Sequence, residues 1–207
     1  MTSPTPRPVP ESSYDRLLEA ARTLFASRGY ESTSTAMIAR EAKSSESQLV
    51  KHFGGKEGLL EAIFEDGWKK MGYMFEAIEV APSPRDKLRM LLDLFLRVFE
   101  QDPALKELML LESRRIRKEG HGVMLTQGYG RFVVVVEKIL GAMAQNNQLR
   151  KGFTPAMVRT ALVGLLEGLL REQVLAARHQ IPAAHLTPEN IRTIFNVVFE
   201  AMLVEKK

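Results

Sequence analysis

The 207-residue sequence contains no cysteine, a single tryptophan and no long apolar run. Without cysteine the chain has neither a disulfide framework nor a thiolate ligand, which fits the reducing cytosol. Its apolar runs are short and bounded by charges, far below the roughly 20 residues that a membrane-spanning helix needs. The first ten residues lack the apolar core of a secretory signal. We therefore expect a cytoplasmic protein that has no membrane partner.

The sequence also lacks the usual catalytic signatures. Its four histidines are scattered, and none has a glutamate three residues before it, so the di-iron bundle motif is absent. There is no H-E-x-x-H, no G-x-S-x-G and no phosphate-cradling glycine loop. These absences predict a protein that is not an enzyme and that needs no metal or cofactor.

Positive charge exceeds negative charge only slightly, which gives a net charge of +4. Residues 1–60 hold eight Lys and Arg against seven Asp and Glu, so bulk charge does not argue for a polyanion partner. Placement is more informative, because four of these cations fall in or beside two short predicted helices: Arg40, Lys43, Lys51 and Lys56.

Residues 33–60 have the pattern of two short helices joined by a tight turn, followed by the start of a third helix. Thr33 or Ser34 can cap the first short helix. Ser45 opens the second, with Gln48 at the position that completes a capping box, and Gly54 ends it. A short, capped helix with a polar outer face suits the major groove of DNA, so we interpret this stretch as a helix-turn-helix.

The segment from Tyr14 to Ile63 resembles the DNA-binding domain of the tetracycline-repressor-type (TetR) family of bacterial transcription regulators. The matching pieces are LLEAARTLFASRGYESTS, then MIAREA, then SQLVKHFGGKEGLLEAIF, in that order. The resemblance implies a homodimer that binds a palindromic DNA operator and is released by a small-molecule effector. It also implies dimerisation through the last two long helices.

Candidate DNA contacts follow from this interpretation. Lysines and helix N-termini contact phosphate, whereas amide, hydroxyl and carboxylate groups read base edges. Gln48 has a competing capping role, and Glu46 can instead serve as a favourable charge at a helix N-terminus. For Lys51 the alternative is an ordinary solvated face. The candidates are Ser34, Thr35, Glu46, Ser47, Gln48, Lys51, His52 and Lys56.

The rest of the chain shows helical spacing of apolar residues throughout, so the fold class is all-α with about nine helices. We expect a disordered arm over residues 1–10, a helix-turn-helix domain over 11–55, and a ligand-binding and dimerisation domain over 56–207. The helices are predicted at about 12–28, 34–42, 45–53, 56–80, 84–101, 103–118, 123–146, 154–179 and 187–204.

A cavity for a largely apolar effector is expected among the helices between residues 56 and 179. Ten methionines and ten phenylalanines suit an adaptable apolar site, although such stripes are expected first in an ordinary core and line a cavity only where packing fails. Two carboxylates embedded in apolar runs can orient a ligand. The candidates are Trp68, Met71, Phe75, Phe95, Phe99, Met109, Glu112, Phe132, Val136 and Glu167.

The helices at 154–179 and 187–204 are the predicted dimer interface. Ala161, Gly164 and Gly168 would allow a second helix to approach closely, although packing within one chain is the alternative. A two-fold operator needs a two-fold reader, which favours a dimer. Functionally, we expect a ligand-responsive repressor. The alternative is a helical ligand-binding or adaptor protein that does not bind DNA, favoured by Val50 where the family usually has a tyrosine.

Overall fold

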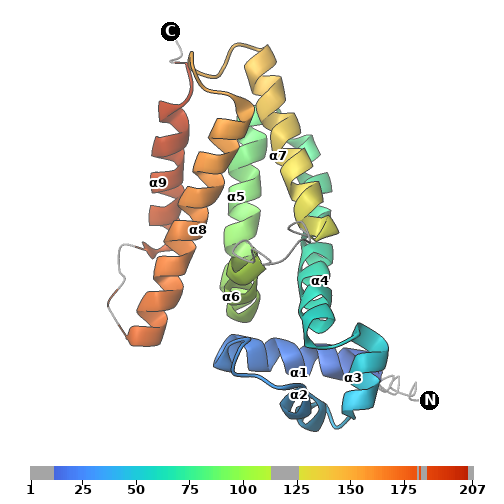
Figure 1. Ribbon diagram of the computed structural model, residues 1–207. Helices are drawn as coiled ribbons and strands as arrows, with labels where there is room; N and C mark the ends of the chain where they lie inside the picture. The colour runs from blue at the N-terminus through green and yellow to red at the C-terminus, as the bar shows by residue number, and fades with distance from the viewer. Residues whose placement is uncertain (1–11, 113–125, 181, 183–185, 205–207) are drawn as a thin grey trace, which may run out of the picture. The chain divides into compact units, whose positions relative to one another are not determined.

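The computed structural model describes residues 12–112, 126–180, 182 and 186–204, and the side chains of residues 111 and 112 lie outside that description. Within these residues the chain forms nine α-helices and one isolated β-bridge, so the predicted all-α class is confirmed (Figure 1). The chain divides into two compact units, Met1–Ile63 and Phe64–Lys207. This division falls inside a helix, eight residues beyond the predicted boundary at residue 55.

The first unit contains α1 (Ser13–Arg28), α2 (Thr35–Glu41), α3 (Glu46–Phe53) and the beginning of α4 (Lys56–Ala77). A reciprocal capping box between Ser12 and Asp15 starts α1. The inward-facing apolar residues of α1 pack against α2 and α3, which also pack against each other. The fully buried side chains at this junction, Leu17, Phe25, Ile38 and Leu49, form the small core of the unit.

The second unit continues α4 and adds a 3₁₀ turn (Ile78–Val80), α5 (Pro84–Gln101), α6 (Pro103–Glu112), α7 (Gln127–Gln145), α8 (Pro155–His179) and α9 (Pro188–Ala201). Helix α5 packs against α6, α7 and α9, and α8 packs against α6, α7 and α9. Proline at the first helical position and a Ser or Thr cap begin α5, α8 and α9.

Several helix boundaries differ from the prediction. The α-helix that was predicted to reach Val80 ends at Ala77 and tightens into a 3₁₀ turn. Helix α7 begins at Gln127 because Thr126 caps it, rather than near residue 123. Helix α9 stops at Ala201, and Leu203 then forms a bridge with Leu149. Residues 113–118 of the predicted sixth helix and the predicted arm over 1–10 lie outside the described residues.

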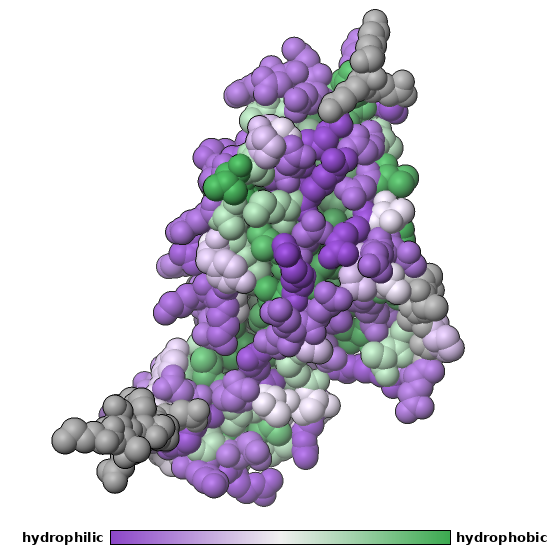
Figure 2. Space-filling view, turned by 180° about the vertical axis from the view of Figure 1, so that it is seen from behind, coloured by the Kyte–Doolittle hydropathy of each residue, from purple (hydrophilic) through white to green (hydrophobic). Residues whose placement is uncertain are grey.

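Hydrophilic side chains cover most of the face shown in the space-filling view, with hydrophobic residues visible between them (Figure 2). Beneath the surface of the second unit, buried residues from α4, α5, α7, α8 and α9 form one continuous cluster. No helix among the described residues is long and apolar enough to cross a membrane.

The contact between α4 and the first turn of α7 is unusually close. Gly128 faces Trp68, and a Cβ on this glycine would lie 2.1 Å from the Trp68 Cβ. One turn before Trp68 on α4, the Glu65 carboxylate accepts a 2.6 Å hydrogen bond from the backbone N–H of Gln127. A carboxylate at a helix N-terminus also interacts favourably with the helix dipole. Glycine at 128 is therefore what allows Trp68 to pack against α7.

Gly128→Ala should lower the free energy of unfolding by about 1–3 kcal/mol, the typical cost of overpacking a filled site. The matched control is Gly130→Ala in the same helix, where an added Cβ meets nothing within 4 Å. That control should gain about 0.5–1 kcal/mol, because alanine favours a helix over glycine. Chemical denaturation of both variants tests this, and equal effects at the two positions would contradict the packing account.

Candidate nucleic-acid interface and ligand cavity

Helix α3 presents a polar outer face on a buried inner stripe. Leu49 is fully buried and Phe53 is half-buried, with the Phe53 ring 4.6 Å from the Tyr14 ring of α1. The side chains of Ser47, Gln48 and Lys51 are exposed on the opposite side. The inner stripe thus fixes α3 on its platform and leaves the polar residues directed to solvent.

Hydrogen bonds hold both ends of α2, and one of them comes from α1. The Arg16 guanidinium of α1 donates a 3.0 Å hydrogen bond to the backbone carbonyl of Ala42, the residue that ends α2. Thr33 is buried, and its hydroxyl donates to the carbonyl of Gly29 at 2.9 Å. Ser34, rather than Thr33, caps α2 by accepting from the Met37 N–H. These contacts fix where α2 begins and ends.

The predicted contacts at the start of α2 and α3 already interact with each other. The Thr35 hydroxyl donates a 2.5 Å hydrogen bond to the Glu46 carboxylate. Ser45 caps α3 by accepting from the Gln48 N–H at 3.2 Å. In the part of the chain that the structure describes, the Gln48 side chain makes no bond back to Ser45. Only half of the predicted capping box is formed, and the Gln48 amide remains exposed.

Two other predicted contacts are engaged within the first unit. The His52 Nε2 lies 2.8 Å from the Ser13 hydroxyl, and its ring meets the Tyr14 ring edge-on at 5.8 Å. The Lys56 ammonium lies 4.2 Å from the centre of the Tyr30 ring, a cation–π contact. Both side chains therefore contribute to the packing of this unit.

Lys43 in the turn has φ of +47°, the left-handed region that favours glycine. We expect Lys43→Gly to raise the unfolding free energy by up to about 1 kcal/mol by relieving this strain. The control is Lys51→Gly inside α3, which should lose about 1 kcal/mol of helix propensity. Thermal denaturation compares the two, and a loss at both positions would contradict the strain at Lys43.

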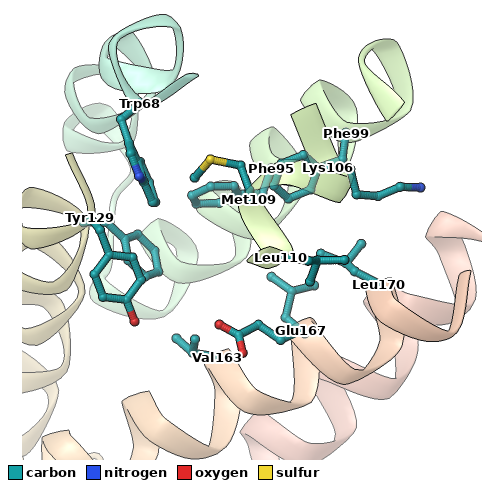
Figure 3. Close-up of a pocket in the computed structure, with 12 residues that line it drawn as sticks. Trp68, Phe95, Phe99, Lys106, Met109, Leu110, Tyr129, Val163, Glu167 and Leu170 are labelled. Atoms are coloured by element: carbon teal, nitrogen blue, oxygen red, sulfur yellow. The ribbon is translucent and has the colours of Figure 1, made fainter. Parts of the chain in front are cut away.

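A largely apolar cavity opens in the second unit, between α4, α5, α6, α7 and α8 (Figure 3). The empty space between its walls, including the part open to solvent, is about 560 Å³. Its lining residues are Trp68, Phe95, Phe99, Lys106, Met109, Leu110, Tyr129, Phe132, Val163, Leu166, Glu167 and Leu170.

Aromatic rings form much of this wall. The Phe132 ring lies 5.6 Å from Trp68, 5.5 Å from Phe95 and 5.9 Å from Tyr129, measured between ring centres. Trp68 reaches the cavity from α4 and Tyr129 reaches it from α7 (Figure 3). Phe132, also on α7, lines the same cavity. Trp68 therefore both lines the cavity and packs against Gly128.

Two charged side chains interrupt the apolar lining. Glu167 extends from α8 toward Tyr129, whereas the amine of Lys106 points away at the opposite end (Figure 3). That amine lies 3.4 Å from the side-chain oxygen of Gln173. Burial lowers the pKa of Lys106 below its ordinary value, although Glu107 and Glu100 act in the other direction.

A second apolar cavity adjoins the first, because Phe95, Phe132, Val163 and Leu166 line both. Its other walls come from α5, α7, α8 and α9, with Arg159 as its one charged lining residue. An apolar ligand body can therefore extend along the shared wall from one cavity toward the other.

Six of the predicted ligand contacts line the first cavity, namely Trp68, Phe95, Phe99, Met109, Phe132 and Glu167. Val136 lines the second. Met71 is fully buried and Phe75 packs against the same core, and neither lines these two cavities. The side chain of Glu112 lies outside the described residues. Sequence reasoning missed Lys106, Leu110, Tyr129, Val163, Leu166 and Leu170.

Comparison with known proteins identifies the first unit. Residues 17–63 match the family model described as bacterial regulatory proteins, tetR family. The chain is 36% identical over 93 residues to the HTH-type transcriptional repressor KstR2 of Mycolicibacterium smegmatis. That alignment covers 44% of this chain and 43% of the relative, so it spans less than half of the relative's length.

Solved structures resemble the whole fold. A tetR family transcription regulator from Shewanella sp. PV-4 matches with a TM-score of 0.73 and 22% identity, over 94% of this chain and all of that one. The regulator FadR of Bacillus subtilis in complex with stearoyl-CoA also gives 0.73, at 19% identity over 92% and 97% of the two chains. At these identities the likeness establishes the fold.

Proposed function

We propose that this chain, whose residues 17–63 match the tetR family of bacterial regulatory proteins, is a homodimeric repressor that binds a palindromic DNA operator and responds to a small molecule. The observation that carries the proposal is the exposed polar face of α3 within the matched segment. In this proposal α3 enters the major groove, and the same helix of the partner subunit enters it again one helical turn away.

The contacts of the free protein suggest different roles for the candidate residues. Ser47, Gln48 and Lys51 are exposed, so we assign them to the groove. Glu46 accepts from Thr35, and its carboxylate has room for a further donor from a base edge. Ser34 and Lys56 lie near a helix start, where backbone N–H groups favour phosphate. His52 is held by Ser13, and we place it beside the backbone rather than on base edges.

Lys51→Ala should weaken binding to all duplexes by a similar factor, because a phosphate contact carries no sequence information. It should also reduce the slope of log affinity against log salt by about one. Lys151→Ala is the matched control, since it removes an exposed lysine from the other unit. Fluorescence anisotropy at several salt concentrations measures both. An unchanged slope for Lys51→Ala would remove this lysine from the phosphate contacts.

The cavity supports a response to a small molecule. Trp68 lines it and belongs to α4, the helix that begins at Lys56 directly after the helix-turn-helix. A ligand that binds one conformer of the second unit more tightly shifts the population toward that conformer. In our proposal the favoured conformer no longer places both recognition helices on their half-sites, and the operator is released.

Exposed apolar side chains support dimerisation through α8 and α9. Met157 on α8 is 52% exposed and Val197 on α9 is 65% exposed. Gly164 of α8 has nothing within 4 Å of an added Cβ, so this part of the helix is open to a second chain. Two such helices from each subunit would make a four-helix interface.

Val197→Glu should shift the protein toward monomer by at least about tenfold in dissociation constant, because it buries an unpaired charge at the proposed interface. Val134→Glu is the matched control, as Val134 is 66% exposed but lies on α7. Sedimentation velocity over a concentration series compares the variants. Equal behaviour of the two would place the interface elsewhere.

A helical adaptor that does not bind DNA is the second candidate. The observation that favours it is Val50, which stands where the family usually has a tyrosine and is 55% exposed on α3. A gel shift with the DNA upstream of the protein's own gene separates the two candidates. Absence of any complex at low salt would favour the adaptor.

A further inference from the structure

We propose that the effector is a hydrophobic cation, an ammonium group on an apolar body, whose positive charge lies between Glu167 and the aromatic wall of the cavity. This inference rests on the proposed role of the cavity as the effector site. It deepens that role by naming the charge and shape of the ligand.

The carboxylate of Glu167 carries the first part of the argument. It extends from α8 into the cavity (Figure 3), and the other α8 residues that line this cavity, Val163, Leu166 and Leu170, are apolar. Removing a carboxylate from water is costly unless a partner offsets the loss. Glu167 already interacts within the chain, and a carboxylate has room for about four hydrogen bonds. A cationic ligand therefore adds to its interactions, whereas an anionic ligand would be repelled.

The aromatic rings carry the second part. Trp68, Tyr129 and Phe132 gather within about 6 Å of one another, with ring-centre distances of 5.6, 5.9 and 6.0 Å. Ring faces are electron-rich and attract cations that approach within about 6 Å, and quaternary ammonium groups are recognised in this way. In Figure 3, Tyr129 lies on the side of the cavity toward which Glu167 extends. Ring faces and carboxylate thus favour the same sign of charge.

Two cations that line the cavities argue for an anion instead. Arg159 in the second cavity lies 3.1 Å from the Glu137 carboxylate, which offsets its charge. The other cation is Lys106. Its amine points away from Glu167 (Figure 3) and lies 3.4 Å from Gln173. Glu107 and Glu100 interact favourably with its charge, although the Glu107 carboxylate also pairs with Arg178. An anionic head group bound to Lys106 would place its apolar body near Phe99. It would also have to displace the favourable interaction of Lys106 with the carboxylates of Glu107 and Glu100. The second cavity, reached along Phe95 and Phe132, accommodates the apolar body of a ligand whose head lies at Glu167.

The test compares three ligands that share one tail and differ in head charge: decyltrimethylammonium, decanol and decanoate, each below its aggregation concentration. Trp68 is the only tryptophan and lines the cavity, so its fluorescence reports binding to the full-length protein, with calorimetry as a second readout. We expect the cation to bind at least about tenfold more tightly than the alcohol, and the anion most weakly. Binding of decanoate as tight as that of the cation, or binding of none of the three, would overturn the inference.

Glu167→Gln tests the carboxylate directly. It should weaken decyltrimethylammonium about tenfold, leave decanol nearly unchanged and strengthen decanoate. Glu172→Gln is the matched control, because Glu172 lies on the same helix with its side chain 55% exposed. An unchanged ranking in Glu167→Gln would reject the assignment. The ranking on the unmodified protein decides the proposal even if this variant folds poorly.

These titrations need no DNA, so the two proposals fail separately. A protein that ranks the cation first but binds no duplex keeps the ligand assignment and loses the repressor function. A protein that binds its operator but prefers decanoate or decanol keeps the repressor function and loses the ligand assignment.

Discussion

The helix-turn-helix depends on burial against α1. Helices α2 and α3 have seven and eight residues, and helices of this length are not stable alone in water. Their stability comes from Ile38 and Leu49, which are fully buried, and from side-chain caps at Ser34 and Ser45. Because these inward residues set the rotation of each helix, they also decide which side chains face outward. The polar face of α3 is therefore placed by the core beneath it.

The helix pattern of the chain was largely predictable because it follows from local chemistry. Caps at Ser12, Ser45 and Thr154 and the left-handed stop at Gly54 lie where side-chain hydrogen bonding and glycine geometry require them. The prediction was less accurate where tertiary contacts decide. Helix α9 ends early because the chain after Ala201 pairs with the connection between α7 and α8, and a helical repeat of apolar residues carries no sign of that pairing.

In the candidate sites, too, local sequence pattern predicts some features and tertiary contacts decide the others. Exposure of Ser47, Gln48 and Lys51 follows from helical periodicity. The links from Thr35 to Glu46 and from Ser13 to His52 join residues that are 11 and 39 positions apart, and no sequence pattern predicts them. In the cavity, residues such as Met71 and Phe132 look alike as sequence, because both lie on apolar stripes. Only the packing of α4, α7 and α8 decides which of them faces empty space. Glu167 was predicted, and the helical spacing of Val163, Leu166 and Leu170 around it would have predicted the other α8 residues that line the cavity.

The tail of the second unit is held by backbone atoms. The N–H of Arg150 donates to the carbonyl of Met202, and the N–H of Val204 donates to the carbonyl of Gln148, both at 2.9 Å. Bonds of this kind do not depend on which side chain a residue carries. Side chains alternate between opposite faces along an extended segment, so adding or deleting one residue here would turn the buried Leu203 toward water. Exposed positions of this pairing such as Val204 can therefore change in composition, whereas the spacing of the paired residues and the apolar side chain of Leu203 are constrained.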